Sequence, residues 1–197
     1  MKTLNFLLTF YFLALSLTVS ILDCNTRWSV KGSSTLVING STNINSFECL
    51  SINYEGEDSI VERCNDSTGV RTYNGKIVML SKGFDCQHPI MTRDFKKTLN
   101  ADEFPEIEIK FIDLATDPAL NDDSQLTGNV EIKMAGRAKV YPISCNVSTD
   151  EKGNKYLMGS QLFTFSEFVL DRPQKFFGAI KVRDQVSVDF RLKMDAM

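Results

Sequence analysis

The sequence predicts an all-β fold, an antiparallel barrel of eight strands with one short helix, preceded by an N-terminal signal peptide. Three observations lead to this prediction. Apolar and polar residues alternate along most of the chain after Arg27, turn-forming residues separate the alternating segments, and a single stretch has helical spacing instead. The alternation is clearest near the C-terminus, where five apolar residues follow at intervals of two: Val186, Val188, Phe190, Leu192 and Met194.

The first twenty residues are typical of a secretory signal peptide. Lys2 is followed by an apolar run over 6–17 and by small residues that suit a cleavage site, namely Ala14, Ser16 and Ser20. Two alternatives stay open: an uncleaved membrane anchor, since the apolar run continues to Leu22, and lipid attachment at Cys24. We expect contact with a membrane only through such an N-terminus.

The rest of the chain, 27–195, has the length of one domain and shows no repeat or linker. Its mildly acidic charge, −3 for the whole chain, is spread without a basic patch, which argues against nucleic acid as a partner.

The remaining strands are predicted from the same alternation and from β-branched and aromatic residues. They cover 28–38, 44–54, 59–64, 77–84, 107–111, 130–134, 138–147 and 156–170. Turns are predicted at Asn39-Gly40, 55–58, 65–69, Asn74-Gly75 and 150–154, with a polar loop at 116–124.

One amphipathic helix interrupts the strands. Met91, Phe95 and Leu99 are four residues apart with charged residues between them, which predicts a helix of about three turns. Thr92 is its expected N-cap, and Pro105 prevents its extension.

Closure into a barrel removes the sheet edges that invite aggregation, although a two-sheet sandwich would show the same alternation. A barrel of about eight strands can hold one small ligand. The expected wall of such a tunnel consists of inward apolar residues: Ile109, Phe111, Val130, Ile132, Met134, Val188 and Phe190. The alternative is that these residues fill a solid core.

Four ordered groups of segments together resemble the YceI-like family, and the resemblance covers 28–194. They are Trp28-Ser29-Val30 with 32–34; 91–99 with 104–107; 126–130 with 134–136; and 165–168 with 177–182 and 184–186. The family usually has a glycine after the residue that corresponds to Phe168, where this chain has Val169.

The resemblance implies a lipocalin-like antiparallel barrel, export to the periplasm, and a long tunnel for an isoprenoid or another amphiphilic lipid. The four cysteines within the domain allow two disulfides in three connectivities. The cysteine-containing variants of the family favour Cys49 with Cys86, which leaves Cys64 with Cys145.

Catalytic or metal chemistry has little support in the residues. Cys86 and His88 with Cys49 or Cys64 are candidate zinc ligands, but the chain has no Cys-x-x-Cys pair. A Cys86–His88 nucleophile pair competes with a simple disulfide in an exported chain. No nucleotide-binding or nucleophile-elbow motif is present, so we expect no enzyme activity, no metal and no cofactor.

The predicted function is therefore non-covalent binding of a long apolar ligand by a periplasmic or secreted protein. A solid-cored envelope domain that acts through protein contacts is the alternative, and an exported hydrolase with converging carboxylates is a third class. The sequence leaves the oligomeric state open.

Overall fold

The computed structural model describes residues 25–52, 54, 56, 58–116, 124–175 and 179–197. The predicted signal peptide at 1–20 and Cys24 lie outside the described residues. Among the described residues, no helix has both the length and the apolar character needed to cross a bilayer.

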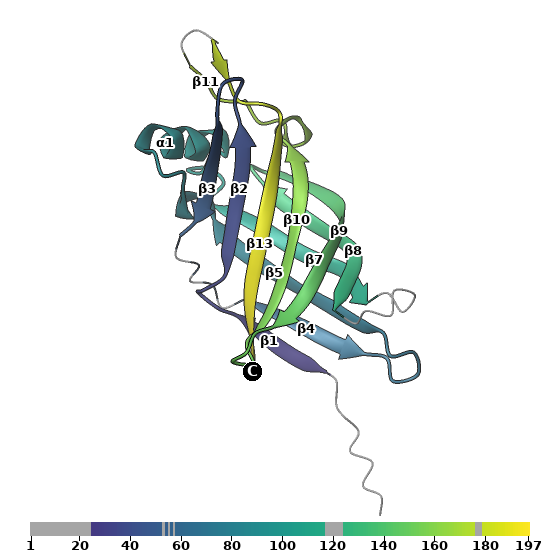
Figure 1. Cartoon of the computed structure of the whole chain (residues 1–197). Helices are drawn as coiled ribbons and strands as arrows, with labels where there is room; N and C mark the ends of the chain where they lie inside the picture. Colours follow the sequence, from purple (N-terminus) through teal and green to yellow (C-terminus); the bar gives the residue numbers. More distant parts are fainter. Residues whose placement is uncertain (1–24, 53, 55, 57, 117–123, 176–178) are drawn as a thin grey trace, which may run out of the picture.

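Eight strands form a closed antiparallel ring (Figure 1). In order around the ring they are β1 (Thr26–Val30), β4 (Ser59–Cys64), β5 (Arg71–Leu80), β7 (Glu106–Thr116), β8 (Gln125–Met134), β9 (Arg137–Thr149), β10 (Lys155–Thr164) and β13 (Gln185–Ala196). The pairing of β1 with β13, which places Val30 opposite Met194, closes the ring. The predicted barrel is confirmed, and the two-sheet sandwich is wrong.

Three shorter strands extend the sheet at one end of the barrel: β2 (Thr35–Ser41), β3 (Ser46–Ser51) and β6 (Phe84–Asp85). β2 pairs with β13 over 187–191, and β1 pairs with the last part of the same strand. The predicted strand 28–38 is thus two strands with a turn between them. We call the end that carries β2, β3 and β6 the open end, and the end that carries β1 and β4 the closed end.

The helix α1 (Pro89–Thr98) lies at the open end, beside β3 (Figure 1). It begins at Pro89, whose fixed φ suits the first helical turn, and His88 is its N-cap residue. Thr92 is not the cap as predicted. Its hydroxyl accepts a hydrogen bond from the Cys86 backbone N–H (2.9 Å) and donates one to Asp85 (3.0 Å).

Two predicted turns are wrong because their glycines are needed inside strands. Gly40 lies within β2 and pairs with Phe47 on β3, whose ring occupies the space that a Cβ would take. The turn that follows falls at 42–45 and is held by the Thr42 hydroxyl. Gly75 lies within β5 at a register irregularity, where a Cβ would meet the backbone of Ser59.

The turns at 65–69 and 150–154 are confirmed between β4 and β5 and between β9 and β10. The predicted strand 156–170 ends at Thr164, and a short 3-10 turn, Ser166–Phe168, follows. Most of the predicted loop at 116–124, and Glu55 and Glu57 of the predicted turn at 55–58, lie outside the described residues.

The closed end of the barrel is solidly packed. Its fully buried side chains include Ile60, Tyr73, Leu114, Leu126, Leu157 and Met194. Inward residues nearer the open end, such as Ile38, Val186 and Val188, are only partly buried. The two ends of one barrel therefore differ: one end is a core, and the other has room inside it.

Candidate functional site

An apolar groove with a volume of about 400 Å³ lies at the open end of the barrel. Three parts of the chain form it: the β2–β3 hairpin, the inward side of α1, and residues from 165–173 and 180–186. The last range contains β12 (Ile180–Lys181), which pairs with β11 (Gln174–Lys175). Most of its lining side chains are apolar, among them Ile38, Ile44, Phe47, Ile90, Met91, Phe95, Phe165, Ile180, Val182 and Val186.

The groove continues into the barrel. A second, smaller cavity of about 80 Å³ lies deeper, and Ile38, Phe95, Phe165 and Val186 line both spaces. Its other side chains are also nearly all apolar. They come from β2, β5, β6, β7, β8, β10 and β13, from Leu99, and from Phe168 and Leu170. The open end therefore offers an apolar groove and an adjoining inner cavity that have four apolar side chains in common, and we call the two together the apolar path.

The apolar face of α1 covers this path instead of a solid core. Phe95 packs against Phe84 with their ring centroids 5.4 Å apart, and both rings line the inner cavity. Leu99, just after the helix, lines the cavity as well. The apolar residues of the helix therefore form part of the wall of a cavity.

A disulfide fixes the start of this helix to the sheet. Cys49 on β3 is bonded to Cys86, three residues before Pro89, which confirms the predicted Cys49–Cys86 pair. Cys49 also lines the groove. The bond joins two residues that are 37 positions apart in the sequence, and it links the start of α1 to β3 on the other side of the groove.

The second predicted disulfide, Cys64–Cys145, is wrong. Cys145 is a free, buried thiol on β9, and burial raises its pKa to about 12. Cys64 takes part in a disulfide, but not with Cys145. Strand pairing places Cys145 opposite Leu126 in the core of the closed end, and none of the other cysteines lies opposite it in the ladder.

The predicted tunnel wall divides into two sets. Ile109, Ile132, Met134 and Val188 line the inner cavity. Phe111 and Val130 belong to the packed core and are only 4% and 1% exposed, and Phe190 is partly buried and packs against that core. The role of all seven in ligand binding stays a prediction.

Sequence reasoning missed the residues that α1, β2 and the 165–182 segment contribute to the groove. The helical spacing of Met91 and Phe95 was visible, but a helix stripe does not reveal whether it covers a core or a cavity. Ile38 and Val186 belong to strands that were predicted, but the period of a strand does not show whether an inward residue lies in a packed core or lines a groove.

The closed end contains a buried carboxylate, Glu62, which is 2% exposed. It accepts hydrogen bonds from Trp28 Nε1 (2.7 Å), Arg71 Nη1 (2.9 Å), the Tyr73 hydroxyl (2.9 Å) and Lys155 Nζ (3.2 Å). Burial alone raises the pKa of Glu62, but these donors and the charge of Lys155 outweigh it, and the pKa is lowered. A carboxylate held ionised in this way is a poor general acid.

The residues that the structure describes contain no group of three metal-ligating side chains. Cys49 and Cys86 are oxidised to each other, so neither supports the zinc site or the Cys86–His88 nucleophile pair considered from the sequence. His88 instead occupies the N-cap position of the helix, without a side-chain capping hydrogen bond, and borders the groove.

Comparison of sequences gives no relatives: no family model matches the chain, and no curated protein matches it. Comparison of folds does. BcnA of Burkholderia cenocepacia has a TM-score of 0.62 at 13% identity, over 81% of this chain and 95% of BcnA.

A polyisoprenoid-binding domain from Saccharophagus degradans, implicated in plant cell wall breakdown, has a TM-score of 0.60 at 10% identity, over 86% of this chain and 98% of that domain. The YceI protein of Campylobacter jejuni has a TM-score of 0.52 at 9% identity, over 74% of this chain and 83% of that protein. The chain has the YceI-like fold. At identities this low the likeness establishes the YceI-like architecture alone, and the groove must be interpreted from its own residues.

Proposed function

We propose that this protein binds one long apolar molecule, an isoprenoid or a similar lipid, without covalent chemistry. The observation that carries the proposal is the apolar path, that is, the groove and the adjoining inner cavity. A volume of about 400 Å³ falls within the range of roughly 300–1,000 Å³ that is typical of small-molecule sites. Each CH₂ group that leaves water for such a path stabilises the complex by about 0.8 kcal/mol.

The polyisoprenoid-binding domain with the same fold supports this ligand class. The cavity argues against the solid-cored alternative, which predicts a filled barrel. The lowered pKa of Glu62 and its four donors give no support to a hydrolase.

Export is part of the proposal. The Cys49–Cys86 disulfide is typical of an oxidising compartment outside the cytoplasm, and the signal-like residues 1–20 suit a periplasmic or secreted protein. Intact mass and N-terminal sequencing of the protein from its native host test this. We expect a chain that starts after Ser16 or Ser20. A chain that keeps Met1 would contradict cleavage and favour the uncleaved membrane anchor.

The binding site is tested by filling the junction between groove and inner cavity. Val186→Trp places a large ring where the two spaces meet, and we expect its affinity for the fluorescent probe N-phenyl-1-naphthylamine to fall at least tenfold. Val140→Trp is the matched control, because Val140 is 55% exposed on the outer face of β9 and lines neither space. Circular dichroism checks that both variants keep the fold.

A wild-type protein that does not take up the probe would overturn the proposal. So would a folded Val186→Trp variant that binds as tightly as the control. Native mass spectrometry of the protein purified from its own envelope then identifies the bound molecule by its mass.

A further inference from the structure

Cys64, the last residue of β4 at the closed end of the barrel, takes part in a disulfide. The chain has five cysteines. Cys49 and Cys86 are bonded to each other, and Cys145 is a free thiol. Within one chain, Cys24 is therefore the one cysteine left as a partner for Cys64. Cys24 lies outside the described residues, but the strand that follows it is described.

The register of β1 against β4 predicts where Cys24 lies. The two strands are antiparallel, and Thr26 lies opposite Glu62. Each step toward the N-terminus on β1 is therefore matched by one step toward the C-terminus on β4. Two steps beyond Thr26 bring position 24 directly opposite Cys64. Only Asn25 separates Cys24 from the strand, and consecutive Cα atoms are about 3.8 Å apart, so the chain stays close to this place.

Directly opposite residues of an antiparallel pair suit the geometry of a disulfide. Their Cα atoms are about 4.5–5.5 Å apart and their side chains share one face, and the Cα atoms of a disulfide are usually about 4.4–6.8 Å apart. The other disulfide of this chain has the same relation to its strands. Leu50 on β3 lies opposite Asp85 on β6, and Cys49 and Cys86 are the next pair along that ladder.

We infer that Cys24 and Cys64 form a second disulfide, which joins the start of β1 to the end of β4. The bond forms by thiol–disulfide exchange. Both thiols lose their S–H bonds, and two electrons and two protons pass to a disulfide oxidant of the exporting compartment, which becomes two thiols. The inference rests on the export that we propose, because thiols of cytosolic proteins are kept reduced.

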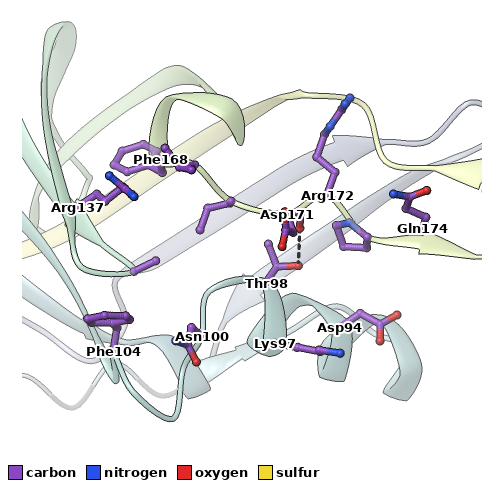
Figure 2. Close-up of a pocket in the computed structure, with 14 residues that line it drawn as sticks. Asp94, Lys97, Thr98, Asn100, Phe104, Arg137, Phe168, Asp171, Arg172 and Gln174 are labelled. Carbon is purple, nitrogen blue, oxygen red and sulfur yellow. Dashed lines mark hydrogen bonds between the residues drawn. The ribbon is translucent and has the colours of Figure 1, made fainter.

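The two disulfides each hold a short element at one end of the barrel. At the open end, the Cys49–Cys86 bond holds the start of α1. Its last residue, Thr98, donates a hydrogen bond from its hydroxyl to the Asp171 carbonyl oxygen (3.3 Å) beside a polar cleft (Figure 2). At the closed end, β1 has only five residues and closes the ring by pairing with both β13 and β4. The second disulfide holds this closing strand at its N-terminal end.

The second disulfide also excludes lipid attachment at Cys24. A thioether-linked lipid and a disulfide need the same sulfur atom, which cannot carry both bonds. The two expected cleavage sites, after Ser16 and after Ser20, both precede Cys24 and keep it in the mature chain.

Peptide mapping without a reducing agent tests the bond in the mature protein purified from its native host. Free thiols are first alkylated in denaturant. Trypsin then places the five cysteines in five different peptides, because lysine or arginine residues separate them all. We expect a peptide that ends at Arg27 to be linked to 64–71 and to separate from it on reduction. The intact, non-reduced protein should have the mass of one chain with a single alkyl group, on Cys145.

An alkylated Cys64, an acylated Cys24 or a link from Cys64 to a second chain would overturn the inference. The Cys49–Cys86 pair is the internal control. If that pair is linked while Cys64 is free, the second disulfide is wrong and the proposed export stands. If both pairs are reduced, the proposed export is wrong as well.

Unfolding of variants provides a second test. Cys24→Ser and Cys64→Ser should each lower the urea midpoint, and the double variant should lower it no further, because all three lack the same bond. In dithiothreitol the three variants and the wild type should unfold at nearly the same midpoint. Additive losses in the double variant would show that the two cysteines act independently.

Discussion

Val169 adopts a backbone conformation that a β-branched residue rarely takes. It ends the 3-10 turn Ser166–Phe168 with φ 54° and ψ 40°, in the left-handed region. That region costs a residue with a Cβ about 1–2 kcal/mol, and glycine avoids this cost. The glycine that the YceI-like resemblance places here thus has a physical reason, and this chain carries the strain instead.

Val169→Gly should therefore stabilise the fold by about 1 kcal/mol in urea unfolding. The side chain is 67% exposed, so its removal leaves no cavity. Val140→Gly, in extended backbone on β9, should destabilise by a similar amount. If both glycines destabilise, residue 169 is not strained.

At the closed end, the single carboxylate of Glu62 accepts hydrogen bonds from four side chains. Glu62→Gln would remove the buried negative charge that pairs with Arg71 and Lys155 and should cost about 3 kcal/mol of unfolding free energy. Glu108→Gln is the exposed comparison: its partners Lys76 and Lys133 are solvated, and its loss should cost under about 1 kcal/mol. Equal costs in chemical unfolding would show that the burial of Glu62 does not matter.

The same carboxylate predicts a pH dependence. The folded-state pKa of Glu62 lies below its ordinary value of 4.5, so its contribution to stability is complete above that pH and is lost as pH falls through the folded pKa. Stability measured from pH 7 to pH 2 should decline less steeply in Glu62→Gln than in wild type. Parallel curves would contradict this assignment.

At the scale of elements, α1 depends on a covalent link for its place over the groove. The helix has no buried residue between Pro89 and Thr98, and the Cys49–Cys86 bond holds its N-terminal side against β3. We therefore expect α1 to be the element that loosens first when this bond is removed.

Cys49→Ala/Cys86→Ala should destabilise the protein by about 4 kcal/mol, from the loop of 37 residues that the bond closes. Hydrogen exchange should speed up in 89–98 and in β3. The β8–β9 hairpin should keep its protection when the variant and the wild type are compared under conditions that give them the same unfolding free energy. Uniform acceleration over the whole chain would show that the disulfide stabilises the fold globally and does not position α1 specifically.

At the scale of the whole molecule, the barrel has a solidly packed closed end and an open end whose cavity we expect to bind and release a ligand. Saturation with N-phenyl-1-naphthylamine should slow exchange in α1, β2 and β3, which surround the groove, and leave β1 and β4 unchanged. Protection centred on the closed end would place the ligand elsewhere.

Much of this architecture was predictable because the pleat of a strand fixes a period of two. That period assigned Ile109, Ile132, Met134 and Val188 to the barrel interior, where the structure places them. Helical spacing likewise identified α1 through Phe95, but its boundary was wrong, since Thr92 serves the preceding turn and not the cap.

What the sequence by itself determined is therefore the class of fold, the inward face of each strand and the apolar face of the helix, because all three follow from local chain geometry. Only the tertiary structure decided which inward residues fill a core, as Phe111 and Val130 do, and which border a cavity, as Ile109 and Ile132 do. That difference depends on what lies across the barrel. For the same reason the pairing of the cysteines depends on distances between segments that are far apart in the chain.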